Sequence, residues 1–548
     1  MRVRRVLTIC LTLAIGVIAP GGWRAVQSAQ SGGTSRVERW PSLGIDVNEL
    51  VLDNGFRILL VEDHHVPRVA ASLWYRFGGL QEQNGEHGAA HFLEHAMHQG
   101  TTTVGIRDWE ADRKIWSEIW TTEQQLLAER NAHRNLLRER NIFFNEGDWP
   151  ATEEETRLRR RLYDLEDQQA KNRVFWEEYN WYRRNGGIMR HGDPVPANTG
   201  NELLRIEVDL PKERPEIFFR LEADRMVNAV FRGWEAQRFT VLEQFYVLQR
   251  HETGRFAEAL NNVTGGPHPI FNHPGGHQRD FAYFNRASML RMYEDFIVPN
   301  NATLVLVGDM TIDQVKPIAA KYFGRLARAP EPPARMDVEV DPPPGGSVRF
   351  DWLEPLEPQV TVRYRIPGVG HRDRPAFDVI ARVLRGPNGV LAQTQSGRGG
   401  GEWSANASQN GSPNTLSMQS SAARDEDLPA LETVAADAVE RLRRGAVDEA
   451  NLARMKRELR LDWEIVRSDR GSLASQIGGF AVADDWRTLK TYYDARDAVT
   501  VADIRRLSEK YLVPWNRVTA TTRRNPQPRA EGTTTSAAAS ERPQGGAR

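Results

Sequence analysis

The segment AAHFLEHAMHQG, residues 89–100, places two histidines four residues apart with a glutamate between them. On a helix, residues four apart stand one above the other, so His91 and His95 can both direct an imidazole nitrogen at one ion, about 2.0–2.1 Å away. Glu94 can then reach a water held by that ion and accept a proton from it. The spacing therefore predicts a metal centre that activates water, with Glu94 as the base.

The elements on either side of this cluster are predicted to hold it against a sheet. Residues 55–63 and 68–79 are rich in β-formers and are separated by the turn-like HHVP, which predicts an antiparallel pair of strands. The helix that carries the histidines follows. Residues 301–310 form another short apolar strand, and Thr311 is expected to cap the helix after it.

The second half of the chain repeats this plan. Residues 358–368 and 414–422 read as strands, residues 374–386 as a helix, and residues 500–522 close this half as 299–326 close the first. We expect an α+β fold of two related α/β lobes, each an antiparallel sheet with helices, joined by a Pro-rich linker. The expected boundaries are 40–327 for the first lobe, 328–347 for the linker, 348–524 for the second lobe and 525–548 for a disordered tail.

Residues 107–187 differ from the rest and are predicted to form a helical-hairpin insertion in the first lobe. Thr152 and Glu155 make a capping box, and charges recur at spacings that suit exposed helix faces. Acidic residues alternate with basic ones, which argues against nucleic-acid binding. Five tryptophans of this region suit either the seam of the hairpin or a peptide-contacting surface: Trp109, Trp116, Trp120, Trp176 and Trp181.

Residues 1–30 have the charged, apolar and small-residue order of a secretory signal peptide. Its apolar run is too short to span a bilayer, and no later stretch is apolar enough to do so, so we expect an exported protein, periplasmic or secreted. The single cysteine, Cys10, would leave with the signal, so His, Asp and Glu remain as metal ligands. The formal net charge of −1 gives no field directed at nucleic acid or anionic lipid.

Residues 52–101 and 299–326 resemble the pitrilysin/insulinase family of zinc metallopeptidases, which includes the mitochondrial processing peptidase. The order His-x-x-Glu-His is the inverzincin signature. The resemblance implies repeated lobes that close into a chamber for unfolded peptides, within one chain or between two related subunits. It also implies Zn²⁺ as cofactor, His91 and His95 as its ligands, and Glu94 as the general base.

The third ligand departs from the family pattern. The family has a glutamate on a downstream helix, within a segment that resembles residues 234–249 here, and alignment on Arg238 places Gln244 at that position and Gln237 at a supporting acid. A neutral amide oxygen holds zinc less tightly than a carboxylate. Glu243 is the alternative third ligand, and reaches the metal only if the helix rotates or bulges.

Substrate-binding positions also differ from the family. Asn198 and Thr199 correspond to an edge strand that pairs with the substrate, although Pro196 lacks an N–H for such pairing. In the second lobe, relatives carry an Arg and a Tyr seven residues apart that hold the substrate carbonyl. This sequence has Trp403 at the Tyr position and only Arg398 nearby. His98 shares a helix face with His91 and His95 but is expected to be a packing or surface residue.

Two functions of different class follow from these residues. The first is an exported zinc endopeptidase that cuts short or unfolded peptides, as a homo- or heterodimer in which a related subunit supplies missing groups. The alternative is a catalytically impaired or non-catalytic partner subunit of a two-chain peptidase chamber. The intact His91, Glu94 and His95 favour the first, and the altered third ligand favours the second.

Overall fold

The computed structural model describes residues 33–140, 150–190, 196–266, 268–278, 280–282, 284–332, 347–396, 400–411 and 413–525. The expected signal peptide, most of the expected linker, Arg398 and nearly all of the expected tail lie outside these residues. The chain divides into two compact units, and neither is one continuous stretch. The first contains residues up to 245, 273–336 and 465–487, and the second contains 246–272, 337–464 and the residues from 488. The sequence-based domain boundaries stay proposals.

The first lobe is built on an eight-stranded sheet with the order β1-β2-β3-β8-β4-β7-β5, and β6 also pairs with β7. The prediction that residues 55–63 pair directly with 68–79 is wrong. β8 lies between them, parallel to β3 and antiparallel to β4. Every residue of β8 is buried, so this apolar strand takes the centre of the sheet. The strands are β1 Thr34–Trp40, β2 Ile45–Val51, β3 Arg57–Glu62, β4 Arg68–Tyr75, β5 Ile188–Met189, β6 Ala197–Thr199, β7 Leu204–Pro211 and β8 Ala302–Gly308.

Helices α1, α5, α8 and α9 contribute buried side chains to the same core as this sheet. Their apolar residues recur every three or four positions; Leu93 and Met97 of α1, four positions apart, are examples, both fully buried. The helices from residues 89–322 are α1 Ala89–Met97, α2 Trp109–Glu139, α3 Glu153–Asn172, α4 Glu177–Arg184, α5 Glu216–Asn228, α6 Trp234–Arg250, α7 Glu252–Gly265, α8 Arg286–Phe296 and α9 Ile312–Tyr322.

The second lobe is built on a five-stranded sheet with the order β11-β12-β10-β13-β9. Its strands are β9 Val348–Pro355, β10 Gln359–Ile366, β11 Ser404–Ala407, β12 Asn414–Ser421 and β13 Arg517–Arg523. The remaining helices are α10 Pro375–Leu384, α11 Val390–Gln395, α12 Leu428–Arg443, α13 Glu449–Ser468, α14 Arg470–Ala483, α15 Thr488–Ala498 and α16 Val501–Tyr511. Helices α10, α11, α12 and α16 form a second apolar core with β10 to β12.

The two lobes repeat one topology, as predicted. In each, the last strand lies between two earlier strands, parallel to one and antiparallel to the other: β8 lies between β3 and β4, and β13 lies between β9 and β10. A matching asparagine precedes each inserted strand. Asn301 donates to the carbonyls of Phe296 and Arg76, and Asn516 donates to those of Tyr511 and Arg365. Both amides tie the end of a preceding helix to a neighbouring strand, so the repeat extends to individual hydrogen bonds.

One helix of each compact unit comes from the other half of the sequence. α14 follows most of the second lobe in the chain but packs on β4 and β8 of the first sheet. Gly478 of α14 faces the Trp74 indole so closely that a Cβ there would lie 2.1 Å from Nε1. Conversely, α7 precedes the second lobe but packs on β9, β10 and β13, where Phe256 and Leu260 join Val518 in a small apolar cluster.

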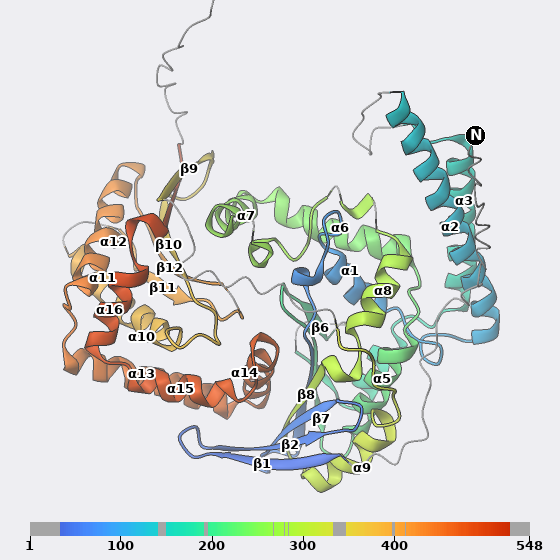
Figure 1. The fold of residues 1–548 in the computed structure, drawn as a ribbon, viewed down its shortest axis with the longest axis horizontal. Coiled ribbons are helices and arrows are strands. Elements are labelled where there is room, and N and C mark those ends of the chain that lie inside the picture. The colour runs from blue at the N-terminus through green and yellow to red at the C-terminus, as the bar shows by residue number, and fades with distance from the viewer. Residues whose placement is uncertain are drawn as a thin grey trace, which may run out of the picture. The chain divides into compact units, whose positions relative to one another are not determined.

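The predicted helical hairpin is present as α2 and α3, which lie side by side (Figure 1). Thr152 caps α3, as expected, by accepting a hydrogen bond from the Glu155 N–H. The buried guanidinium of Arg286, at the start of α8, pairs with Glu123 of α2 and with Glu166 of α3. The same guanidinium lies 4.9 Å from the ring of Trp234, the first residue of α6. The hairpin therefore contacts the start of the helix that carries Gln237 and Gln244.

Candidate active site

Helix α1 carries the His-x-x-Glu-His motif, and its start is fixed by a carboxylate from the preceding segment. Glu82 accepts hydrogen bonds from the N–H groups of Gly88 and Ala90, at 3.0 and 2.8 Å, which satisfies two donors at the helix N-terminus. Burial raises the pKa of Glu82 to about 8, and the nearby Glu86 and Asp280 add to the rise. The sequence analysis did not identify Glu82, because it lies outside the local capping pattern.

The structure brings His91 and His95 together on one face of α1. Their ring centroids are 4.9 Å apart, at an interplanar angle of 77°. Burial lowers the pKa of His91 to about 3, assisted by His95 and His273, and burial also lowers the pKa of His95. Both imidazoles are therefore neutral near pH 7, which is the form that binds a metal.

Glu94 is 5% exposed and points to the edge strand β6. The Thr199 hydroxyl donates a hydrogen bond to Glu94 Oε2 at 2.6 Å. Burial raises the pKa of Glu94 to about 7, although the hydrogen bonds from Thr199 oppose that rise. A carboxyl with such a pKa can take up and release a proton near neutrality, as a general base must. From the sequence, Thr199 was expected only as part of an edge strand, because this strand and α1 meet only in the fold.

Helix α6 places both glutamines beside His95. Gln237 Oε1 lies 3.1 Å from His95 Nδ1, and hydrogen bonds from Gln237 and Gln244 both act to raise the His95 pKa against the effect of burial. Gln244 is exposed and Glu243 is half-buried. The structure thus brings Gln244 to the histidine pair, at the place where the resemblance implied a third ligand. Whether Gln244 or Glu243 binds the metal stays a prediction.

The other predicted residues fall in different places. Asn198 is exposed on β6, opposite Arg205 of β7. Trp403 belongs to the second unit, is 3% exposed and packs in its core. His98 is buried and stacks on Tyr179 with ring centroids 6.1 Å apart, so its prediction as a packing residue is confirmed.

Comparison with known families gives two matches within this chain. Residues 57–114 match the family described as Insulinase (Peptidase family M16), and residues 283–459 match the one described as Peptidase M16 inactive domain. The chain belongs to the M16 peptidase family. The first match includes the whole of α1, and the second extends from α8 into α13, so both lobes of the M16 chain are represented.

Known relatives and structures agree with this assignment. The zinc protease PqqE of Helicobacter pylori is 21% identical over 269 residues, which are 45% of this chain and 56% of the relative. A crystal structure of a protease from Helicobacter pylori superposes with a TM-score of 0.66 at 16% identity, over 89% of this chain and 100% of that one. The periplasmic protease PqqL from Escherichia coli gives a TM-score of 0.62 at 16% identity, over 87% of this chain and 48% of that one.

This M16 chain matches only part of each of two relatives. It spans little more than half of the PqqE relative in sequence and about half of the PqqL structure. Two α/β lobes of M16 type are therefore present, as the fold prediction expected. Within the described residues, every helix is either too short or too polar to cross a bilayer.

Proposed function

We propose that this M16 chain is an exported zinc-dependent endopeptidase that hydrolyses short or unfolded peptides, with Glu94 as general base. The observation that carries the proposal is the position of Glu94. It is buried, one residue from His95, and hydrogen-bonded to Thr199 of an edge strand. The PqqE relative is named a zinc protease, which supports the metal and the reaction class. PqqL is described as a periplasmic protease, which supports export.

The residues present fit a zinc ion. His91 and His95 offer two neutral imidazoles from one helix face, with centroids 4.9 Å apart, and the Gln237 amide holds the Nδ1 side of His95. A hydrogen bond to one ring nitrogen fixes the orientation of the other, as in known histidine–metal sites. When bound, zinc lowers the pKa of water and polarises a carbonyl group.

The strand β6 is suited to hold the peptide. Among the described strands it pairs only with β7, so its other edge is open to an added strand. Asn198 is exposed on that strand, while the Thr199 side chain turns inward to Glu94. A peptide laid along β6 would run beside α1, which contacts β6. Its scissile carbonyl would then lie near the histidine pair.

Glu94 performs the proton transfers in this scheme. Its carboxylate accepts a proton from the attacking water, and the resulting carboxyl group delivers that proton to the amide nitrogen that leaves. The Thr199 hydrogen bond orients Oε2 and opposes the desolvation that favours the protonated acid. Such transfers contribute about 10²–10⁴-fold to the rate in other enzymes.

The runner-up is a catalytically impaired or non-catalytic partner subunit. The amides at Gln237 and Gln244 favour it, because a site without a third carboxylate holds zinc less tightly. The chain also spans 48% of the PqqL structure, which supports a chamber made with a second copy or a related subunit. Arg398 remains a proposed substrate-contacting residue of the second lobe. Trp403 was predicted with it, although its side chain packs in the core of that lobe.

One pair of variants separates the two functions. Glu94→Gln keeps the shape and a hydrogen-bond acceptor, so the purified protein should retain its zinc while cleavage of an unstructured fluorogenic peptide falls at least about a hundredfold. His91→Ala with His95→Ala should lower the zinc content by one equivalent per chain, measured by elemental analysis. Parent protein that neither holds zinc nor cleaves peptide, alone or with excess zinc, would favour the non-catalytic partner.

A further inference from the structure

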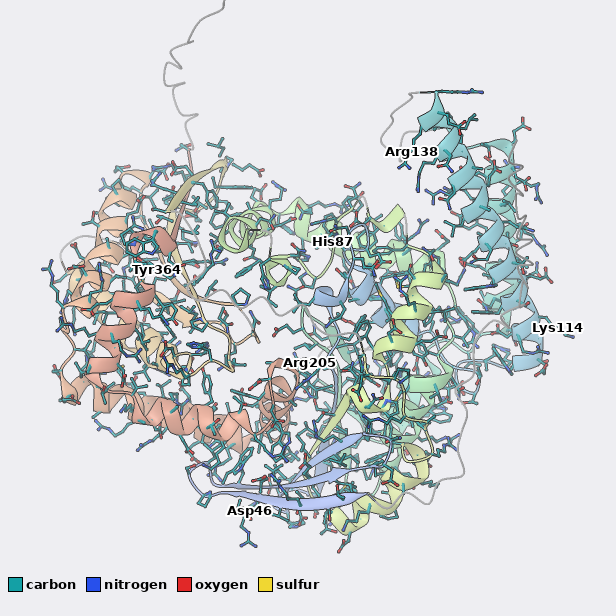
Figure 2. All side chains as sticks on the ribbon, viewed as in Figure 1. Asp46, His87, Lys114, Arg138, Arg205 and Tyr364 are labelled. Atoms are coloured by element: carbon teal, nitrogen blue, oxygen red, sulfur yellow. The ribbon has the colours of Figure 1, made fainter. Side chains whose placement is uncertain are left out.

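A second cluster of metal-ligating side chains lies at the entrance to α1, outside the site described above. His87 is in the turn before the helix (Figure 2), and His277 and Asp280 come from the segment that follows α7. One ligating atom from each lies within 4.8 Å of the others. His87 Nδ1 is 2.7 Å from Asp280 Oδ2, and the two imidazole centroids are 4.6 Å apart.

The backbone holds these two segments rigidly together. The His277 N–H donates to the His87 carbonyl at 3.3 Å, and the Asp280 N–H donates to the His277 carbonyl at 2.9 Å. Gly276 has φ +81°, and a Cβ there would lie 2.1 Å from the His87 carbonyl oxygen. Only glycine permits that approach. The three side chains are therefore brought together by main-chain contacts that do not depend on a bound ion.

The charge of the surroundings favours a cation. Asp280 is 2% exposed, and its Oδ2 accepts a hydrogen bond from the His87 N–H at 3.1 Å in addition to its contact with His87 Nδ1. Buried carboxylates are stabilised by such paired groups or by a metal ion. Glu86, next to His87, pairs through Oε1 with Arg291 at 3.0 Å. Its second oxygen, Oε2, is buried and accepts no hydrogen bond among the described residues. Two carboxylates and two imidazoles thus meet in one partly buried region.

We propose that His87, His277 and Asp280 form a second metal site, for Zn²⁺ or a similar borderline divalent cation. A donor set of two imidazoles and a carboxylate binds such ions in preference to Mg²⁺ or Ca²⁺. At bond lengths of about 2.0–2.2 Å, the ligand atoms would lie about 3.3–3.5 Å apart, so small side-chain rotations close the site. The fourth position is open to water.

The ion would act on the structure of α1. His87 stands four residues before His91, so a metal bridge from His87 to His277 and Asp280 fixes the first turn of the helix against the backbone of those two residues. The competing explanation is a metal-free hydrogen bond between His87 and Asp280. In that case His277 contributes no ligand, and its loss would leave zinc binding unchanged.

The test uses the full chain with His91→Ala and His95→Ala, so its result does not depend on the proposed catalytic zinc. After equilibration with Zn²⁺ and dialysis, this double variant should retain about one zinc per chain by elemental analysis. Adding His277→Ala should remove that zinc. The matched control is His371→Ala, a half-buried histidine of the second unit that accepts a backbone hydrogen bond from Asp373, and it should leave the zinc in place.

A second measurement covers the case in which His277→Ala does not fold. Asp280→Asn keeps the shape of the side chain and an acceptor for His87 but removes the ligand charge, so Zn²⁺ affinity in the double-variant background should fall at least tenfold. Cobalt(II) should give visible d–d absorption in that background and lose it with Asp280→Asn. A double variant that binds no Zn²⁺, or a His277→Ala variant that binds as much as the His371→Ala control, would overturn the proposal.

Discussion

Thr199 Oγ1 lies 2.6 Å from Glu94 Oε2, and this hydrogen bond joins the edge strand β6 to the helix that carries the metal motif. The two residues are more than a hundred positions apart in the chain, so their contact belongs to the fold and not to the motif. Both the hydroxyl and the backbone of Thr199 act on the proposed base, and both lower its pKa against the effect of burial. The proton affinity of Glu94 therefore depends on a strand that the peptide would also touch.

Thr199→Val should shift the pH dependence of cleavage. The hydrogen bonds from Thr199 lower the Glu94 pKa against the effect of burial, so loss of the hydroxyl raises that pKa. Because the base must be ionised, the acidic limb of the kcat/KM profile should move to higher pH by up to about one unit. Thr199→Ser is the matched control and should restore the parent profile. Profiles that coincide for all three proteins would exclude a role for this hydrogen bond.

Gln244→Glu and Glu243→Ala test the third ligand. If Gln244 faces the metal, Gln244→Glu adds a charged ligand, and zinc affinity should rise about tenfold or more while cleavage increases. Glu243→Ala should change little. Zinc affinities are measured by competition with a chromogenic chelator. The reverse pattern, with zinc lost in Glu243→Ala and Gln244→Glu neutral, would identify Glu243 as the ligand.

Glu82→Gln should change how stability depends on pH in the metal-free protein. The folded-state pKa of Glu82, about 8, lies above its unfolded value near 4.5, so the folded protein binds the Glu82 proton more tightly than the unfolded chain does. The free energy of unfolding that this proton contributes is fully present below pH 4.5 and is lost as the pH rises through 8. The variant keeps an acceptor for the Gly88 and Ala90 N–H groups but cannot ionise. The free energy of unfolding is measured by chemical denaturation in EDTA at pH 5 and at pH 8. Between these two values, it should fall by on the order of 2 kcal/mol more in the parent than in the variant. Glu110→Gln, on an exposed face of α2, should leave the slope unchanged.

Gly478→Ala and Gly479→Ala form a matched pair on α14. A Cβ at Gly478 would meet the buried Trp74 indole, whereas one at Gly479 has nothing within 4 Å. Overpacking should lower the free energy of unfolding by about 1–3 kcal/mol in Gly478→Ala. Gly479→Ala should raise it by up to about 1 kcal/mol through helix propensity. Equal stabilities in urea would mean that α14 does not pack on Trp74.

Local sequence patterns predicted the features of this protein that depend on contacts between residues close in the sequence. The spacing of His91 and His95 placed them on one helix face, and capping Thr152 marked the start of α3. The repeat of two lobes was also predicted, because runs typical of strands and helices recur in both halves of the sequence. Such features are set by neighbours within a few turns of chain.

Long-range contacts were beyond local patterns. The turn-like HHVP indicated a hairpin, but β8, a strand more than two hundred residues later, inserts between β3 and β4 because its fully buried side chains need the centre of the sheet. The roles of Glu82 and Thr199 depend on side chains that reach a helix from separate segments. The cluster of His87, His277 and Asp280 joins residues from two distant loops.

The crossing of α7 and α14 makes the two halves of the chain interdependent. A cut between residues 332 and 347 would leave the N-terminal fragment without α14 over β4 and β8, and the C-terminal fragment without α7 over β9, β10 and β13. Each fragment alone would expose an apolar sheet surface that the other was made to cover. Produced together, the fragments should reassemble as an obligate pair, so the peptide bonds of that segment can be broken without separating the halves.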